Sequence, residues 1–456
     1  MDETEVQGEA RPSILAPGRR RLTAGMVLVV SFIAFEAIAV ATVLPVVVRH
    51  LGGLRLYGWA FSAFMLAQLV GIVVAGPHVD RSGMFRPTVA AVTLFSIGLL
   101  VDGVAPSMTV LVAGRVVQGL GAGVLVVTLN VLVGRGYPPA LRPRAYAAMS
   151  TAWVVPGVLG PAVAGVVAEH LSWRLVFLGI VPAVAVAAAI ALPAIAGTDV
   201  APVDGAERTE PAADVGTGPG VVAALSLAGG TALVIEALGA RQPVLSPLLA
   251  LVGLALVVPA VRAVLPTRSA WGSGPSAPAT DGRRIGTMAV AALVNLGFFG
   301  AEAFLPLSLT SLHHRSVTEA GVVLTVAALS WTAASWVQAR FVAVVGPRRL
   351  CAAGLALVAV GVTGVGTLDW PATPWWVGFL AWGVAGAGMG LSYATTTLVV
   401  LTSAGPGRQG GPIAALQVLV TLGVAVGAGL GGAALALSLA LGHGRAPGLR
   451  ALDAVA

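Results

Sequence analysis

Glu36, Arg115 and Glu302 are charged side chains inside segments that are otherwise apolar, and the two carboxyl groups among them could bind a proton reversibly. Glu36 and Arg115 lie in the first and fourth long apolar segments, and Glu302 lies in the ninth. An ionised carboxylate within a membrane helix is costly, so such a group must face neighbouring helices rather than lipid. Glu36 is therefore the prime candidate for a proton-binding group. The alternative is a neutral glutamate that is hydrogen-bonded for packing.

Glu36 and Arg115 are expected to meet. From the rise of a helix, Arg115 lies about 10 Å and Glu36 about 18 Å below the same end of their segments. The difference of about 8 Å is within reach of an arginine side chain or of one bridging water. Such a pair would offset the burial of both charges and tune the proton affinity of the glutamate. The alternative for Arg115 is a side chain that extends toward the membrane surface.

The composition indicates what must position these residues. Of 456 residues, 57% are hydrophobic and 10% are charged, against about 25% charged in a typical soluble domain. The mean hydropathy is +0.93. This composition excludes a water-soluble globule and intrinsic disorder, and a single cysteine excludes a disulfide scaffold. The chain is expected to be a polytopic integral membrane protein.

Thirteen segments are candidates for membrane-spanning helices, since about 20 mostly apolar residues are needed to cross the bilayer. They cover residues 23–48, 57–76, 87–105, 108–134, 145–169, 173–196, 217–239, 245–265, 285–311, 318–345, 350–368, 375–402 and 412–441. The first follows three arginines and is far longer than the core of a signal peptide, so we interpret it as an uncleaved membrane helix.

The arginines orient these spans. All 26 basic residues are arginines, and 18 of them share one side of the membrane, against seven on the other side. Because positive charge collects in cytoplasmic loops, the sequence predicts a multi-pass protein of the plasma (cell) membrane with a cytoplasmic N-terminus. The arginines form no basic patch with interleaved aromatic residues, which argues against nucleic-acid binding.

Two polar stretches divide the chain. The expected organisation is a cytoplasmic tail (1–22), a six-helix half (23–196), a linker (197–216), two inserted helices (217–265), a second linker (266–284) and a second half (285–456). Both halves begin with a long helix that carries a glutamate before a Leu-Pro pair, which indicates a repeat. The second half contains five spans where the first contains six, so we expect a final helix beyond residue 456.

Four segments carry recognisable motifs. Glu36 precedes Pro45 in the first span. The segment after the second span holds Gly76, Asp80, Arg81, Gly83 and Arg86. The fourth span holds Arg115, Gln118, Gly119 and Gly121, and the fifth holds Pro156, Gly157, Gly160, Pro161, Ala164 and Gly165.

These segments resemble signatures of the major facilitator superfamily, and in particular of its fourteen-span drug:proton antiporters. Three positions depart from the usual pattern: Glu36 replaces a commoner aspartate, Phe85 replaces a basic residue and Ala164 replaces a glycine. Two of these motifs also have an interpretation without a specific function. The segment after the second span could be an ordinary basic loop, and the small residues of the fifth span could serve only helix packing.

The resemblance implies an all-helical fold of two six-helix halves with two inserted helices. It implies that Asp80 latches a cytoplasmic gate against the helix that begins near Pro412, and that Arg115 takes part in proton transfer. It also implies that the fifth-span motif forms the hinge found in exporters. Glu302 is a candidate for a cationic-substrate site or a second proton site. Glu236 lies near a helix end, where we expect it to be solvated.

The expected function is proton-coupled efflux of hydrophobic or cationic drug-like compounds. The expected partners are membrane lipids, the substrate and protons. No cofactor is expected beyond the proton gradient, no enzyme activity or metal site is expected, and the protein is expected to be a monomer. The alternatives are an exporter of lipids or of another endogenous metabolite, a proton-coupled importer and a membrane sensor.

Overall fold

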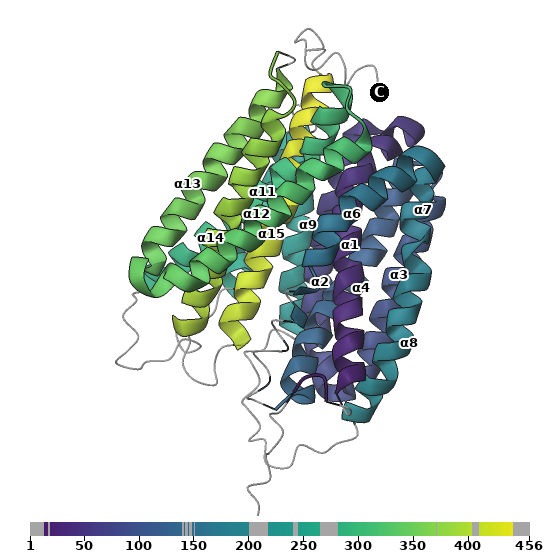
Figure 1. The fold of residues 1–456 in the computed structure, drawn as a ribbon, viewed down its shortest axis with the longest axis vertical. Coiled ribbons are helices and arrows are strands. Elements are labelled where there is room, and N and C mark those ends of the chain that lie inside the picture. Colours follow the sequence, from purple (N-terminus) through teal and green to yellow (C-terminus); the bar gives the residue numbers. More distant parts are fainter. Residues whose placement is uncertain are drawn as a thin grey trace, which may run out of the picture.

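A computed structural model describes residues 13–16, 19–138, 141, 145, 148–149, 151–199, 218–239, 245–264, 281–370, 372–403 and 410–440. Every regular element in these ranges is helical, and twelve of the helical stretches are long and apolar enough to cross a membrane. The helices run side by side as one bundle (Figure 1). The predicted all-helical membrane fold is therefore confirmed.

The helices fall into a first half, a central pair and a second half. The first half contains α1 (Arg20–Leu51), η1 (Leu54–Leu56), α2 (Tyr57–Ser82), α3 (Phe85–Val104), α4 (Met108–Gly136), α6 (Val154–Val167), η3 (Ala168–Ser172), α7 (Trp173–Leu178) and α8 (Ile180–Asp199). The central pair is α9 (Gly218–Gly239) and α10 (Leu245–Val264). The second half contains α11 (Asp281–Ser311), α12 (Val317–Val345), α13 (Pro347–Gly366), η5 (Thr367–Asp369), α14 (Val377–Ser403) and α15 (Gly410–Ala440).

The twelve apolar stretches account for the thirteen predicted spans. One stretch, Val154–Gly197, has 44 residues, which is about 66 Å of helix and about twice the thickness of the hydrocarbon core. The helical backbone is interrupted at Ser172, which is extended (φ −161°, ψ 138°) at the junction of η3 and α7. The Ser172 side chain accepts a hydrogen bond from the backbone N–H of Arg174 and so begins a new helix there. The stretch therefore holds the two predicted spans 145–169 and 173–196.

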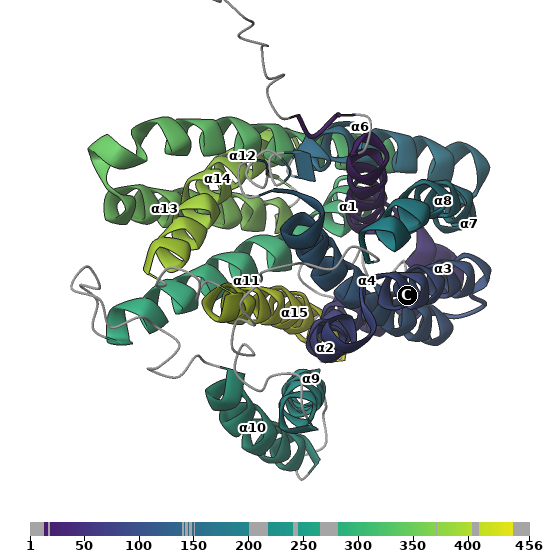
Figure 2. The same cartoon turned by 90° about the horizontal axis from the view of Figure 1, so that it is seen from below.

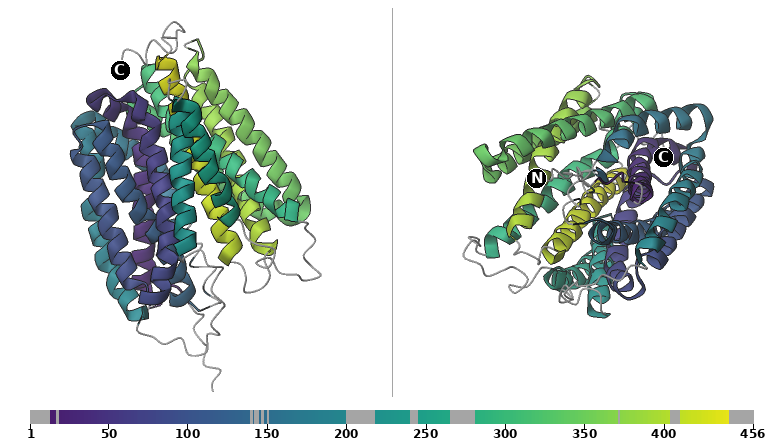
Figure 3. Two further views of the ribbon diagram at one scale, coloured as in Figure 1. Left: turned by 180° about the vertical axis from the view of Figure 1, so that it is seen from behind. Right: turned by 60° about the horizontal axis from the view of Figure 1, so that its bottom comes forward.

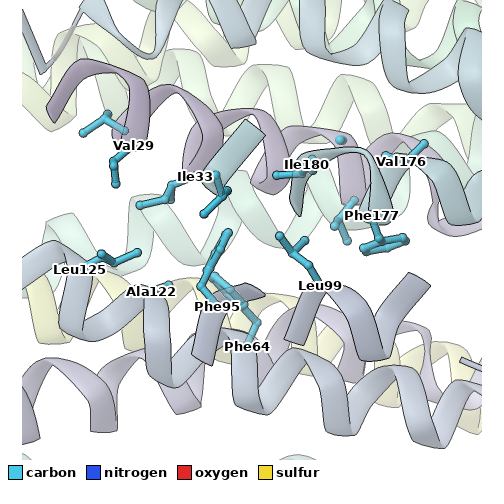
Figure 4. Close-up of a cluster of buried hydrophobic side chains, with 14 of the residues drawn as sticks. Val29, Ile33, Phe64, Phe95, Leu99, Ala122, Leu125, Val176, Phe177 and Ile180 are labelled. Atoms are coloured by element: carbon cyan, nitrogen blue, oxygen red, sulfur yellow. The ribbon is translucent and has the colours of Figure 1, made fainter. Parts of the chain in front are cut away.

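The core of the first half forms where four of its helices face one another. Val29 and Ile33 of α1 lie opposite Phe95 of α3 and Leu125 of α4, and Phe177 closes the cluster from α7 (Figure 4). All of these side chains are buried. Because lipid is as apolar as these residues, the close fit between side chains stabilises the half more than exclusion from water does.

The two halves meet along two seams. In the seam between α2 and α15, a Cβ atom at Gly58 would lie 2.7 Å from Gly432 Cα, and the hydroxyl of Ser62 donates a 2.8 Å hydrogen bond to Ala425 O. In the seam between α6 and α12, a Cβ atom at Gly321 would lie 2.8 Å from Pro161 Cβ. Both sets of contacts lie toward the end of the bundle opposite the start of α1, which we call the far end.

A charged contact also joins the halves at the far end. The carboxylate of Glu169 in η3 accepts hydrogen bonds from the backbone N–H groups of Val317 and Thr318, at 3.2 Å for Thr318, and from the Thr318 hydroxyl at 2.8 Å. Ser316 and Glu319 form a capping box on the same helix. A carboxylate of the first half therefore completes the N-terminal cap of α12 in the second half, where helix N–H groups otherwise lack partners.

The central pair lies outside the bundle over one seam. Figure 2 shows α9 beside α2 and α15, with α10 on its outer side, and Figure 3 shows the pair in front of the boundary between the halves. Leu227 of α9 packs in one cluster with Leu69 of α2 and Val418 of α15. The helices α9 and α10 cross closely, since a Cβ atom at Gly230 would lie 2.8 Å from Gly253 O.

This crossing gives a first prediction. The Gly230→Leu variant should lower the free energy of unfolding by about 1–3 kcal/mol, because the added side chain has no space between α9 and α10. Thermal unfolding of the purified protein in detergent would measure the effect. The neighbouring Gly229→Leu variant is the matched control, since nothing lies within 4 Å of a Cβ atom there. Equal unfolding temperatures for both variants would contradict the described crossing.

Candidate functional site

Glu36 and Arg115 form an ion pair between α1 and α4 inside the first half. A guanidinium nitrogen, Nη1 of Arg115, contacts Oε1 of Glu36. The side chains are 0% and 2% exposed for Glu36 and Arg115, respectively. The structure therefore brings together the two residues that helix rise alone placed at adjacent depths.

Three further contacts hold the arginine. Its Nε donates a 3.0 Å hydrogen bond to Ala60 O of α2, and Nη1 donates to the side-chain oxygen of Gln118. The guanidinium carbon lies 4.1 Å from the centre of the Phe64 ring. A buried ion pair is tolerated only when additional hydrogen bonds satisfy its remaining donors. These contacts fix the arginine against α2 and α4, so that Glu36 is the partner that can change its charge.

Two buried polar atoms of this cluster have no hydrogen-bond partner in the part of the chain that the structure describes: Oε2 of Glu36 and Nε2 of Gln118. Buried polar atoms are almost always paired with protein or with water. Oε2 of Glu36 is therefore the carboxylate oxygen of this pair that is not occupied by Arg115.

Glycines of the fourth-span motif allow the close packing that positions Arg115. A Cβ atom at Gly119 would collide with Phe64 O of α2, and one at Gly121 would lie 2.6 Å from Ala91 O of α3. Helices that approach this closely require small residues at the crossing. The motif thus has one polar face, which holds Arg115 and Gln118, and packing faces against α2 and α3.

Sequence reasoning missed a third charged residue of this region, Asp102 of α3. It is fully buried, and neither of its carboxylate oxygens has a hydrogen-bond partner among the described residues. A Cβ atom at Gly114 would collide with its Oδ1. Asp102 was overlooked because it lies near the end of a predicted span, where a carboxylate is usually solvated. The sequence feature that could have indicated it is Gly114, which precedes Arg115 on α4 and leaves space for the Asp102 carboxyl group.

The segment after the second span was predicted as a loop, and this prediction is wrong. Helix α2 continues to Ser82, and the chain turns at Gly83 with a φ angle of 74°. Backbone hydrogen bonds continue beyond the apolar segment because a helix does not require apolar residues outside the membrane. Only Gly83 needs the left-handed conformation that favours glycine. Arg86 is exposed in the first turn of α3.

The predicted latch was assigned to residues whose side chains lie outside the described part of the structure: Gly76, Asp80 and Arg81 on α2, and Pro412 on α15. The latch therefore stays a prediction.

The fifth-span motif lies in the seam between the halves. A Cβ atom at Gly157 would lie 3.1 Å from Ala328 Cβ, and one at Gly165 would lie 2.8 Å from Thr318 Cα. Pro156, Gly160, Pro161 and Ala164 are also buried in α6. The small residues of this motif thus bring α6 against α12, where the two halves meet.

Glu302 does not join the Glu36 cluster. It lies in α11, is partly buried, and has no ion pair or hydrogen bond within the described ranges. One turn earlier, Phe298 stacks on Trp382 with 4.4 Å between ring centres, and Phe299 lies 6.3 Å from Trp331. Trp331 in turn contacts Tyr393, with ring centres 5.8 Å apart. Glu302 therefore lies beside an aromatic cluster of the second half.

Within the described residues, no group of three or more His, Cys, Asp or Glu side chains could hold a metal ion.

A comparison with family models finds the Major Facilitator Superfamily over residues 26–428. The chain belongs to this superfamily. The solved structures agree on the fold: a peptide transporter of the POT family, PepTSo, is 12% identical with a TM-score of 0.66, and the match covers 95% of each chain. A D-xylose–proton symporter is 14% identical with a TM-score of 0.59, over 92% of this chain and 97% of that one. At such identities these structures show the fold alone.

Several relatives carry names that refer to drug efflux. A probable multidrug-efflux transporter of Mycobacterium tuberculosis is 29% identical over 85% of this chain and 81% of its own length. The multidrug transporter MdtP of Bacillus subtilis is 23% identical over 90% and 74%. An uncharacterised MFS-type transporter of M. tuberculosis is 34% identical, but the match spans 40% of this chain and only 27% of that protein. This superfamily member is therefore a membrane transporter similar to proteins named for multidrug efflux.

The ion pair gives a second prediction. The Arg115→Met variant should lose about 3–5 kcal/mol of stability, because it leaves Glu36 buried without a cation. The double variant with Glu36→Gln should lose less than the sum of the two single variants, with a coupling free energy of about 1–3 kcal/mol. Unfolding of all four proteins in detergent micelles would give this double-mutant cycle. Additive losses would show that the two side chains do not interact.

Proposed function

We propose that this transporter is a proton-coupled antiporter that exports hydrophobic or cationic drug-like compounds across the cytoplasmic membrane. The observation that carries the proposal is the buried Glu36–Arg115 pair, in which one carboxylate oxygen is left without a partner. The names of the relatives support export of drugs, and the fifth-span motif in the seam between α6 and α12 supports the direction of transport.

The coupling follows from the charges at the pair. While Glu36 is ionised, its negative charge balances Arg115, and the pair is neutral as a whole. When Glu36 binds a proton the ion pair is lost, and Arg115, still held by Ala60 O and Gln118, needs another negative charge to balance it. Since an unpaired buried charge is costly, protonation favours a different arrangement of the helices around it. Proton binding and helix arrangement are thereby linked.

We assign the end of the bundle at which α1 begins to the cytoplasm, because arginines concentrate there. The hydrogen bonds that Ser62 and Glu169 form between the halves lie at the far end. In this arrangement the substrate enters from the cytoplasm while the far end is closed. Opening of the far end then releases the substrate outside and admits the proton that Glu36 takes up.

The aromatic cluster beside Glu302 supports the class of substrate. Rings of Phe299, Trp331 and Tyr393 are partly exposed within the second half. Aromatic faces attract cations, and the attraction is strongest where water is excluded. The Glu302 carboxylate, which has no partner among the described residues, adds charge complementarity. A lipophilic cation would thus be held between the Glu302 carboxylate and these rings.

The proposal is tested in inverted membrane vesicles that are acidified inside and carry a fluorescent pH probe, with tetraphenylphosphonium as the probe substrate. The wild-type protein should release protons when the cation is added, and the Glu36→Gln variant should show none, because an amide cannot carry the coupled proton. Glu236→Gln is the matched control, since Glu236 is exposed on α9 and should leave the response unchanged.

Two other outcomes would change the assignment. An equal response in the wild type and in Glu36→Gln would keep antiport but move the proton site to Glu302. Proton release in neither protein would contradict drug antiport and favour export of lipids or another endogenous metabolite.

The Glu169 contact gives a further prediction. The Glu169→Ala variant removes an acceptor from two backbone N–H groups of α12, which costs about 1 kcal/mol and shifts the population about fivefold toward a far end that is open. Spin labels are attached at Arg55→Cys and Trp376→Cys in a Cys351→Ser background. Double electron–electron resonance should then show an additional, longer distance between the two labels. Glu319→Ala is the control, because Glu319 caps only its own helix. An unchanged distance distribution would show that Glu169 does not hold the halves together.

A further inference from the structure

Asp102 is a carboxyl group that the proposed coupling does not use. It lies in the last turn of α3, near the far end, and is fully buried. Both of its oxygens lack a hydrogen-bond partner among the described residues, and Gly114 leaves the space that its carboxyl occupies. A carboxylate that serves only packing would be expected to accept hydrogen bonds, since a buried and unsatisfied charge is destabilising.

The charged groups around Asp102 are few. Its carboxyl group lies against Gly114 of α4, the residue before Arg115, and Arg115 is paired with Glu36 of α1. Arg174 of α7 lies at the end of α3, where it donates a 2.8 Å hydrogen bond to Ala105 O. Its guanidinium group also stacks on the Trp173 ring. One buried arginine therefore serves two buried carboxyl groups, and its contacts in this arrangement go to Glu36, Gln118 and Ala60 O.

Charge balance limits the protonation states of this group. With Arg115 charged, the cluster is neutral only when one of the two carboxyl groups carries a proton. Two buried carboxylates that share one cation behave as a coupled pair in their titration. While Glu36 is ionised and bound to Arg115, charge balance favours the proton on Asp102, because a neutral carboxyl group without a hydrogen-bond partner is less costly to bury than a carboxylate.

We propose that Asp102 is the relay group that receives the proton from the far end and passes it to Glu36, an inference that rests on the proposed proton coupling. After Glu36 has given up its proton, a hydronium ion at the far end protonates the ionised Asp102 and leaves as water, which restores Asp102 as a neutral acid. The neutral acid then transfers this proton, directly or through hydrogen-bonded water, to the carboxylate of Glu36. Asp102 regains its negative charge and Arg115 changes partner from Glu36 to Asp102, so that charge is conserved at each step.

The position of Asp102 fits this role. It lies between Arg115 and the end of α3, whereas Glu36 lies deeper in the bundle. A proton that reached Glu36 directly would have to pass the side chain of Arg115, whose positive charge repels it. A carboxyl group on the outer side of the arginine gives the proton a site from which only a short transfer remains.

The test compares Asp102→Asn with the wild type in two measurements. In infrared difference spectra of the reconstituted protein, the wild type should show the carbonyl band of a protonated carboxyl group that Asp102→Asn lacks. In the vesicle assay, Asp102→Asn should slow proton release driven by tetraphenylphosphonium by at least about tenfold. A cooperative thermal unfolding transition of Asp102→Asn in detergent would show that the variant is folded. Asp369→Asn is the control, because Asp369 is exposed at the same end.

The possible failures are distinguishable. If the wild type shows no proton release, the proposed antiport is wrong. If the wild type releases protons and Asp102→Asn does so at the same rate, the relay is wrong while antiport stands. If the carbonyl band persists in Asp102→Asn, the proton does not reside on Asp102 and the relay is overturned. Asp102→Glu, which keeps a carboxyl group, should restore part of the proton release, whereas a purely structural role would be disturbed by the longer side chain beside Gly114.

Discussion

One arginine inside an apolar bundle is the constraint on which the rest of the site depends. A guanidinium group keeps its charge at any physiological pH, so the helices around Arg115 must supply compensation permanently. They do so with a carboxylate from α1, a backbone carbonyl from α2 and an amide from its own helix. Because the arginine cannot change its charge, each change of charge in the site must come from a carboxyl group.

The packing of α4 follows from the same constraint. A residue on a helix can contact α1, α2 and α3 together only when that helix approaches all of them closely. Gly119 and Gly121 make room for backbone atoms of α2 and α3, and Gly114 makes room for Asp102. The glycines and the arginine therefore depend on each other, because the distance between the helix backbones determines which carboxyl groups can approach the guanidinium group of Arg115.

Much of this arrangement could be predicted from the sequence, and the reasons for the exceptions are physical. Apolar segment length identified the spans, and helix rise placed Glu36 near Arg115. Asp102 was missed because one sequence carries no information about which helices are neighbours, so a carboxylate near a helix end looks solvated. The end of α2 was predicted too early because hydropathy marks where the membrane stops and not where a helix stops. The contact from Glu169 to α12 joins residues 148 positions apart, and no local pattern encodes such a distance.

The location of α9 makes the two seams unequal. On one side, α9 covers the boundary between α2 and α15, packing with residues of both helices. On the other side, Leu159, Val163 and Val166 of α6 and Val322 of α12 remain exposed at the bundle surface. A hydrophobic molecule in the bilayer would face two layers of helices on the first side and only the helices α6 and α12 on the second. The boundary between the halves is therefore covered by an additional helix on one side, whereas apolar side chains of α6 and α12 are exposed on the other.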